Sequence, residues 1–479
     1  MSDQDGTAST TTHVLEGAAS GSAETRGTVH GHGHGHEHGR GRGRSSDTVG
    51  PRTKGLALGA PVTLAEVTAD LPSTTGDTFG WPLLTLDDAA LEHNLTTMAG
   101  VCRAAGVLHA PHVKTTMSRQ VFARQQAHGA WGATVANPAQ LHTVVDWGAR
   151  RVFLANEMVD PRETRRLRTL VETSDPLDPL EVWLYVDSAY GVRLLATTFA
   201  DAAHEVRERV GVLVEVGVAG GRTGTRRPEQ ALDLARSVAG AGLRLVGVAG
   251  YEGSAASGTT PDDLARVAAY CRSLREVAGL FVEAGLVGQD GSPVVVSAGG
   301  SSFLDVVVAE LPGPFDGPDG RTTPVDVLVR SGAYVTHDHG FCARMDPWRR
   351  IPGAVPMRAA ATVWAQVLSA PEPGLVVLGA GRRDLAYDLD LPVALSVRRA
   401  DDDGVLASPE PLVGARVTGL NDQHLFLAVD DLAPGTPALG PGDVVGLGIS
   451  HPCTLFDKWR VAAVVDAEDR VVELFTTDF

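Results

Sequence analysis

The chain has 479 residues, with 41 Lys plus Arg against 58 Asp plus Glu, so its formal net charge is −17. This acidic balance argues against nucleic-acid binding, because phosphates require clustered Lys and Arg. No apolar run reaches the roughly 18 residues that span a bilayer, and the N-terminus lacks a secretory signal. Four cysteines are too few for a disulfide framework in so long a chain and favour a reducing compartment. We therefore expect a cytoplasmic protein without a membrane segment.

Residues 1–54 are rich in Gly, Ser, Thr, His and Arg and carry almost no apolar pattern. Such a segment cannot bury enough surface to offset its ordering entropy, so we expect it to be disordered. It contains the run VHGHGHGHEHGRGRGR, in which five histidines alternate with Gly or Glu. This tract can chelate divalent metal, although a flexible solubilising tail can have the same composition.

From residue 75 to 355, short β-branched runs alternate with longer segments whose apolar residues follow helical spacing. The eight expected strands are His109–Lys114, Gly132–Ala136, Arg151–Ala155, Glu181–Asp187, Gly211–Val216, Leu245–Tyr251, Pro293–Ser297 and Asp326–Arg330. Strands separated by helices form parallel βαβ units, and eight such units close a (β/α)8 barrel. A doubly wound open sheet also fits the alternation, but no Gly-rich fingerprint follows the first strand.

The sequence pattern changes at residue 356, and the pattern of residues 356–479 predicts a separate antiparallel β domain. Its short strand-like runs, separated by Gly, Pro and Asp, include Ala361–Val367, Gly374–Leu378, Leu412–Leu420 and Val461–Glu473. The stretch Pro82–Leu86, which precedes the barrel, is a further strand that could join this domain.

The carboxyl ends of barrel strands form the active-site face of this fold, so their polar residues are the first candidates. Lys114 ends the first strand in HAPHVKTT, where partial burial would lower the pKa of its amine and make it nucleophilic towards carbonyls. The run SAGGSS ends the seventh strand, at the commonest phosphate site of the fold. Its glycine amides and serine hydroxyls could hold a phosphate. The candidates in this run are Ser297, Gly299, Gly300 and Ser301.

Three further residues stand at other strand ends. Arg222 lies in the Gly-rich loop after the fifth strand and could fix a cofactor ring or a substrate carboxylate. Tyr251 ends the sixth strand, and Tyr334 follows the eighth. Each is also compatible with a structural role: an arginine in a loop is often solvated, and a buried tyrosine often serves packing alone.

The C-terminal domain contains His451-Pro452-Cys453. An imidazole and a thiolate two residues apart point to the same side of an extended chain, a spacing that suits tetrahedral zinc. The alternative is a histidine and a buried cysteine that lie close by chance.

In order along the chain, WPLLTLDDAALEHN, APHVKTT, GATVANPAQL, GGRTG, SAGGSS, RSGAY and HPC resemble the D-serine dehydratase-like and D-threonine aldolase group. At the barrel this group resembles alanine racemase, a fold-type III pyridoxal-phosphate enzyme. The resemblance covers about residues 81–479. It implies a pyridoxal 5′-phosphate barrel followed by a β domain, in a homodimer.

The resemblance assigns Lys114 as the Schiff-base lysine, SAGGSS as the phosphate-binding run, and Arg222 and Tyr251 to the cofactor pocket. His451 and Cys453 match the family's divalent-metal pair. The second ligand in the aldolase branch is typically a carboxylate, so Cys453 favours zinc and the dehydratase branch. The chain departs from the family's usual basic residues around the lysine, because it carries Ala110, Thr116 and Met117 there.

The leading hypothesis is a zinc-assisted deaminase that converts a D-3-hydroxyamino acid such as D-serine into a keto acid and ammonia. Retro-aldol cleavage to glycine and an aldehyde uses the same groups and is the alternative. A racemase would need a second base, for which Tyr334 could serve, but it would leave His451 and Cys453 unexplained. A non-catalytic pyridoxal-phosphate carrier is usually a lone barrel, so the β domain here counts against it. A metal-handling protein built around the His-rich tract is the least favoured, because that tract lies outside the expected fold.

Overall fold

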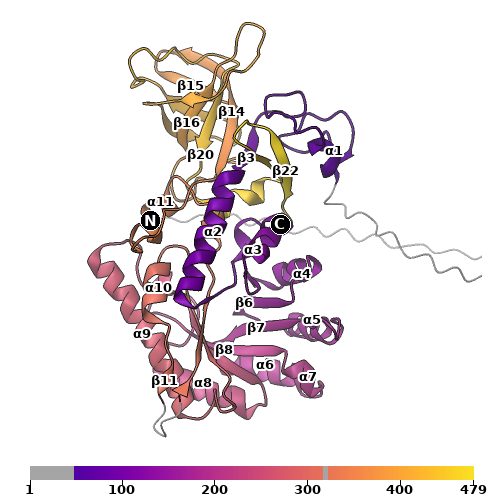
Figure 1. Ribbon diagram of the computed structural model, residues 1–479, viewed down its shortest axis with the longest axis vertical. Helices are drawn as coiled ribbons and strands as arrows, with labels where there is room; N and C mark the ends of the chain where they lie inside the picture. Colours follow the sequence, from indigo (N-terminus) through magenta and orange to yellow (C-terminus); the bar gives the residue numbers. More distant parts are fainter. Residues whose placement is uncertain (1–47, 317–321) are drawn as a thin grey trace, which may run out of the picture. The chain divides into compact units, whose positions relative to one another are not determined.

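The computed structural model describes residues 48–316 and 322–479, which belong to one compact unit (Figure 1). The His-rich tract and the rest of the tail up to residue 47 lie outside the described residues. Within the described parts of the chain, no helix combines the length and apolarity needed to cross a membrane.

Eight parallel strands form the first sheet, in the order β4-β13-β10-β9-β8-β7-β6-β5. The strands are β4 Leu108–His109, β5 Ala133–Val135, β6 Arg151–Glu157, β7 Glu181–Val186, β8 Val210–Val216, β9 Arg244–Gly250, β10 Val294–Ser297 and β13 Val325–Val329. The helices around them include α2 Asp88–Ala105, α3 Arg119–Ala127, α4 Pro138–Asp146, α5 Pro161–Glu172, α6 Ala189–Phe199, α7 His204–Arg207, α8 Pro228–Gly240, α9 Pro261–Glu283 and α10 Leu304–Glu310. Figure 1 shows α4, α5 and α6 outside strands β6 to β8. All eight strands predicted from the sequence are therefore present.

The two ends of this sheet meet, so the strands curl into a barrel. His112 and Thr134 form a parallel bridge between the segments that follow β4 and begin β5. The Thr134 amide also donates to the Pro111 carbonyl at 2.9 Å. The predicted alternation of strands and helices thus produces a barrel, and not an open sheet.

The barrel is a packed core. Phe153, Tyr185, Leu213 and Val295 belong to one buried cluster contributed by different strands. Every residue of β8 is buried, as expected for a parallel strand that is covered on both faces. The interior is therefore filled below the strand ends.

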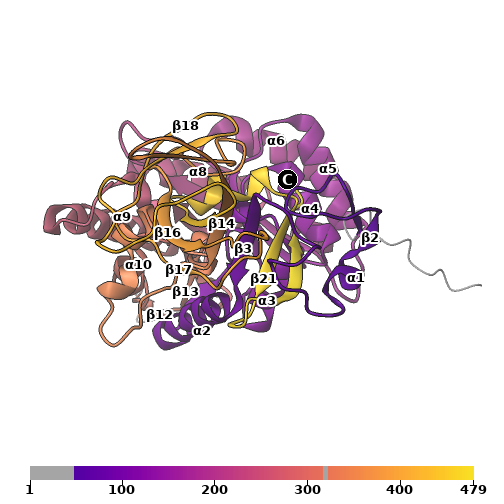
Figure 2. The ribbon, with the colours of Figure 1, turned by 90° about the horizontal axis from the view of Figure 1, so that it is seen from above.

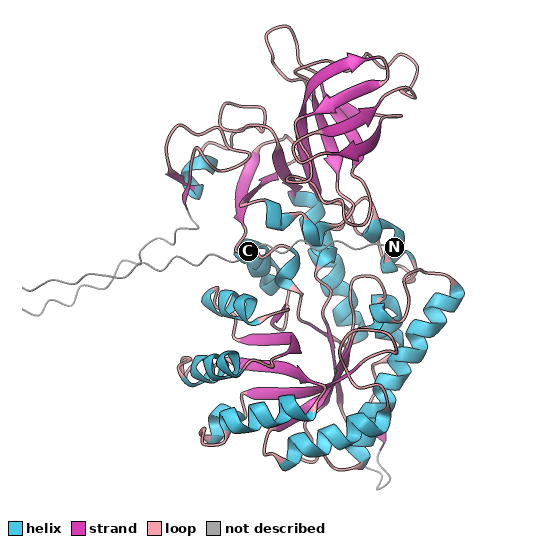
Figure 3. Cartoon of the chain, turned by 180° about the vertical axis from the view of Figure 1, so that it is seen from behind, coloured by secondary structure: helices cyan, strands magenta, loops and turns pink. Residues whose placement is uncertain are grey.

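The second sheet runs β17-β16-β20-β14-β15-β19-β18, with β3, β21 and β22 attached (Figure 3). Its strands are β3 Leu83–Asp87, β14 Ala361–Glu372, β15 Leu375–Leu378, β16 Val393–Arg398, β17 Glu410–Pro411, β18 Arg416–Leu420, β19 Leu425–Ala428, β20 Val444–Gly448, β21 Val461–Val465 and β22 Val471–Thr476. Most pairs are antiparallel, as predicted. Two expected runs differ from single strands. In Leu412–Leu420 only β18 is a strand, and Val461–Glu473 divides into the hairpin β21–β22.

Strand β3 joins this second sheet, as the sequence suggested for Pro82–Leu86. It lies between β14 and β21 (Figure 2), antiparallel to the first and parallel to the second. Four apolar or small residues of β3 are buried, so both of its faces are covered. The segment before the barrel therefore completes the sheet that follows it.

Residues 48–54, which the sequence assigned to the disordered tail, are folded. Strand β1 (Thr48–Val49) pairs with β2 (Val62–Thr63), and α1 (Leu64–Thr68) follows with a capping box between Thr63 and Glu66. The amine of Lys54 lies 2.7 Å from the Asp384 carboxylate. The apolar residues Val49 and Leu56 pack into a second core, which the sparse apolar pattern of this segment did not reveal.

Candidate active site

A cavity of about 530 Å³ opens where the barrel strands end, and its wall comes from both sheets. It brings together most of the site residues chosen from the sequence. These are Lys114, Arg222, Tyr251, Gly300, Ser301, His451 and Cys453. A pocket of this volume is large enough for a small cofactor with its substrate.

Lys114 lies in a 3₁₀ turn, Val113–Thr115, which begins four residues after the end of β4 at His109. The predicted strand over residues 109–114 is thus shorter, although the His112 amide still donates to the Arg330 carbonyl at 3.2 Å. Burial holds the pKa of the Lys114 amine below its ordinary value. The charges of Arg222 and Arg330 act in the same direction, and Cys453 opposes them. This amine can therefore lose its proton more readily than an exposed lysine.

The glycine run after β10 has a different arrangement from the predicted phosphate cradle. The amides of Gly299 and Gly300 donate to the two carboxylate oxygens of Glu252, at 2.9 and 2.6 Å. Glu252 is fully buried, and Gly299 has a φ of +99° with Val329 close to where a Cβ would stand. Glu252 thus engages two amides that we expected to face an anion, and the cavity wall here is formed by Gly300, Ser301 and Ser302.

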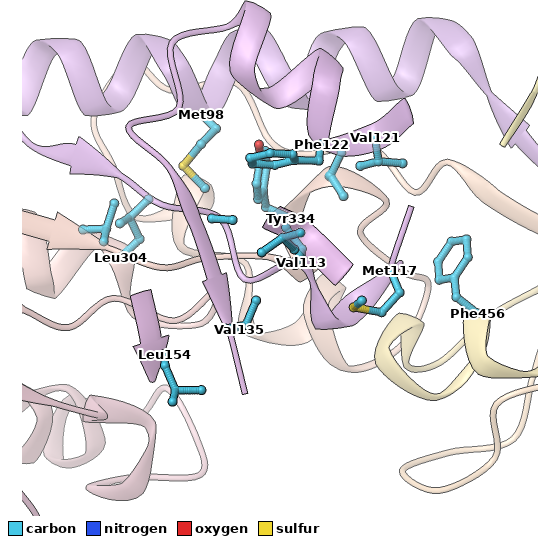
Figure 4. Close-up of a cluster of buried hydrophobic side chains, with 14 of the residues drawn as sticks. Met98, Val113, Met117, Val121, Phe122, Val135, Leu154, Leu304, Tyr334 and Phe456 are labelled. Atoms are coloured by element: carbon cyan, nitrogen blue, oxygen red, sulfur yellow. The ribbon is translucent and has the colours of Figure 1, made fainter. Parts of the chain in front are cut away.

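Besides Gly299, two more of the predicted cofactor residues, Ser297 and Tyr334, do not reach the cavity wall. The Ser297 hydroxyl donates to the Leu328 carbonyl at 2.8 Å and is fully buried. Tyr334 is 2% exposed and lies among apolar side chains such as Phe122 and Met98 (Figure 4). Its hydroxyl accepts a long hydrogen bond from Gln125, at 3.4 Å. The structure therefore gives Tyr334 a packing position, and a second base at that residue is not brought to the site.

Arg222 and Tyr251 line the cavity together. The Arg222 guanidinium lies over the Tyr251 ring, 4.5 Å from its centre. This stacking orients the guanidinium at the mouth, where it is available to a carboxylate or phosphate.

Sequence reasoning missed Arg330, which follows β13. Arg330 is 7% exposed and donates to the Ser297 hydroxyl and to the Gly250 carbonyl. It also lies 5.5 Å from the ring centre of Phe153. As the last residue of a predicted strand, it carried the same signal that singled out Lys114.

Three acidic residues at neighbouring strand ends were also missed. Carboxylate oxygens of Glu157, Asp187 and Glu215 lie within 4.8 Å of one another, and Glu215 lines the cavity. Burial, with a hydrogen bond and negative charge from Glu215, raises the pKa of Glu157 to about 9. One proton is therefore retained in this group near neutral pH.

His451 and Cys453 follow β20 and line the same cavity. The predicted extended geometry holds only for His451, because Pro452–Thr454 is a 3₁₀ turn. Pro452 has a fixed φ that suits the first residue of such a turn. The Thr115 hydroxyl lies 3.4 Å from the Cys453 sulfur, so this turn adjoins the loop that carries Lys114.

His451 and Cys453 shift each other's pKa. Burial raises the pKa of the Cys453 thiol, but hydrogen bonds from His451 and Thr115 and the charge of Lys114 lower it overall. Hydrogen bonding with Cys453 and with Asp388 raises the pKa of His451 to about 9, against burial. Thiolate sulfur and imidazole nitrogen form a donor set that favours zinc.

A family model described as a putative serine dehydratase domain matches residues 360–465. The chain is 24% identical over 353 residues to 3-hydroxy-D-aspartate aldolase from Paracoccus denitrificans, covering 71% of this chain and 84% of that protein. It is 30% identical over 278 residues to D-threo-3-hydroxyaspartate dehydratase from Delftia sp., covering 55% and 66%. The chain belongs to the D-serine dehydratase-like and D-threonine aldolase family.

Solved structures of this family share the fold. D-threonine aldolase from Filomicrobium marinum superposes with a TM-score of 0.65 at 26% identity, over 83% of this chain and 95% of that one. The Delftia dehydratase has been solved as variants of a histidine and of a cysteine two positions later. The cysteine variant, in a metal-free form, has a TM-score of 0.62 at 23% identity, over 83% and 97%.

Members of this family are fold-type III enzymes that use pyridoxal 5′-phosphate, and the cavity fits that group. It combines a buried amine of lowered pKa, the guanidinium of Arg222, and the serine-bearing loop at Ser301. Met117, which replaces a basic residue of the family pattern, is 1% exposed and packs in the core beside the site (Figure 4). A charged side chain would be buried there, so the departure follows from the apolar surroundings.

Proposed function

We propose that this protein deaminates D-3-hydroxyamino acids such as D-serine to a keto acid and ammonia, with pyridoxal phosphate and zinc. The observation that carries this proposal is that Lys114 and the His451–Cys453 pair open into one cavity. The Thr115 hydroxyl, next to Lys114, lies 3.4 Å from the Cys453 sulfur. A group suited to act at the α-carbon and a pair suited to hold a metal at the β-hydroxyl therefore line one cavity.

We propose that Lys114 holds the cofactor and then moves the α-proton. When bound, pyridoxal phosphate supplies an electron-withdrawing ring that makes the substrate's α-hydrogen acidic. The amine of Lys114, whose pKa is lowered by burial, is suited to accept that proton. Arg222 is placed to bind a carboxylate, while Tyr251, Gly300 and Ser301 complete the cofactor wall.

His451 and Cys453 are the residues that would hold zinc. Zinc held by these two residues would supply a Lewis acid for the β-hydroxyl of the substrate. The Delftia dehydratase has been solved as variants of a histidine and a cysteine with the same spacing, one of them metal-free. This agreement in spacing supports the assignment of the pair.

The second candidate is retro-aldol cleavage to glycine and an aldehyde, because two similar proteins are described as aldolases. The thiolate of Cys453 favours deamination, since the family resemblance associates a carboxylate ligand with the aldolase branch. Product analysis separates the two reactions. We expect ammonia from D-serine and from D-threo-3-hydroxyaspartate, with no stoichiometric glycine, and no turnover of the L-isomers. Stoichiometric glycine without ammonia would replace the proposal by its alternative.

We further propose a cytoplasmic homodimer. The free cysteines of the described residues, three of them buried, suit a reducing compartment. Light scattering of the purified protein tests the dimer, for which we expect about twice the mass of one chain. A monomer with full activity would contradict it.

A further inference from the structure

Asp388 is a side chain from a distant loop that contacts the candidate metal turn at two points. It lies between β15 and β16, 63 residues before His451. One carboxylate oxygen, Oδ2, is 2.7 Å from His451 Nδ1, and the other, Oδ1, accepts the Thr454 hydroxyl at 2.5 Å. The carboxylate therefore spans the turn from the residue before Pro452 to the residue after Cys453.

The contact with His451 selects one form of the imidazole. A carboxylate accepts hydrogen bonds only, so in the neutral form of the ring that can bind a metal, Nδ1 carries the hydrogen and Nε2 is left as the nitrogen for a ligand. The ring is also held from its other side, because Phe341 packs against it in an edge arrangement with the ring centres 6.4 Å apart. The Phe341 amide in turn donates to the Ser450 carbonyl at 3.1 Å. His451 is thus oriented before any metal arrives.

The contact with Thr454 acts on the second ligand. Thr454 closes the 3₁₀ turn in which Cys453 is the middle residue. From the barrel side the Thr115 hydroxyl reaches the Cys453 sulfur. Two contacts therefore position Cys453. The Thr115 hydroxyl contacts its sulfur, and Asp388 holds the next residue of the turn, Thr454.

We propose that Asp388 is the positioning residue of the metal site, which fixes the tautomer of His451 and the turn of Cys453. This inference rests on the metal assignment of the proposed function. Carboxylates that accept the second ring N–H of a metal-bound histidine raise the basicity of the ligand and typically strengthen metal binding about 10- to 100-fold.

The test compares zinc affinity in Asp388→Asn, Asp388→Ala and a matched control, Asp390→Asn. Asp390 is two residues away, and its carboxylate pairs with Arg344 at 2.5 Å. Asp390→Asn therefore removes the same negative charge as Asp388→Asn without removing a contact to the His451 side chain. Affinity is measured on the full-length protein by competition with a chromophoric zinc chelator. We expect Asp388→Ala to weaken zinc binding about 10- to 100-fold, Asp388→Asn to weaken it less, and Asp390→Asn to match wild type.

A spectroscopic readout separates positioning from general damage. With cobalt in place of zinc, the sulfur-to-metal absorption reports the geometry around Cys453, and we expect it to shift in both Asp388 variants but not in Asp390→Asn. Wild-type affinity and an unchanged spectrum in both Asp388 variants would overturn the proposal, as would an equal loss in Asp390→Asn. Because the readout is metal binding, a protein that binds zinc but turns over no D-3-hydroxyamino acid refutes the proposed function and leaves this test intact.

Discussion

The two walls of the cavity hold their chemical groups by different means. On the barrel wall, Lys114 follows a strand whose backbone pairing continues through His112, and the packed interior lies directly below. On the wall that follows β20, His451 and Cys453 lie on a short turn that side chains hold in place. Asp388, which braces that turn, is 40% exposed. Backbone pairing and core packing tolerate few changes in geometry, whereas a turn held by side chains can be disturbed by single substitutions.

The strongest test of the barrel wall is Lys114→Ala. We expect loss of at least about a thousandfold in kcat, because the variant lacks both the cofactor anchor and the proton acceptor. Bound pyridoxal phosphate after dialysis should fall in parallel, while zinc affinity stays at the wild-type level. Lys458→Ala, which removes an amine paired with Asp457, is the control. Retained activity in Lys114→Ala would remove the lysine from the mechanism.

The turn is tested by His451→Ala and Cys453→Ser. Each removes one ligand, and we expect deamination to fall about a hundredfold or more as zinc is lost. Bound pyridoxal phosphate should remain, since Lys114 is untouched. Chelation of the wild-type protein should give the same loss, and added zinc should restore it. If the chelated protein kept full activity, the metal at His451 and Cys453 would have no part in the reaction at Lys114.

Glu252→Gln tests how much the hydrogen bonds from Gly299 and Gly300 to Glu252 stabilise the folded protein. The substitution places an amide group where one buried backbone N–H now meets a carboxylate oxygen, so one hydrogen bond is lost and two donors face each other. We expect the free energy of unfolding to fall by about 2 kcal/mol. Denaturant titration measures it, with the exposed Glu283→Gln as control. Equal stability of the two variants would show that the Gly299–Gly300 loop does not depend on Glu252.

The last test concerns the acidic group at the barrel mouth. The folded protein holds the pKa of Glu157 at about 9, above the ordinary value of 4.5. The folded state therefore binds this proton more tightly than the unfolded chain, and the associated stability is lost as pH rises between those two values. Glu157→Gln removes the titration, so its stability relative to wild type should increase with pH over that window. A pH-independent difference in melting temperature would contradict the raised pKa.

Periodicity and strand-end position were enough to predict the barrel, its eight strands and the cavity residues Lys114, Arg222, Tyr251, Gly300 and Ser301. Each of those features is local in sequence, and the fold places the strand ends at one face. Tyr334 was misplaced, because a tyrosine that packs in the core has the same local sequence signal as one at the mouth. Asp388 carried no signal at all, since its role depends on a contact with a turn 63 residues away.

The pairing of β3 with β14 and β21 affects how the chain is made. On the ribosome, residues 83–87 emerge well before residues 361–372 and 461–465, with which they pair. Until then β3 is an apolar strand with free edges, exposed to pairing with other chains. Separate expression of residues 356–479 would remove a central strand from their sheet. We therefore expect that the C-terminal sheet does not fold stably without the segment that contains β3.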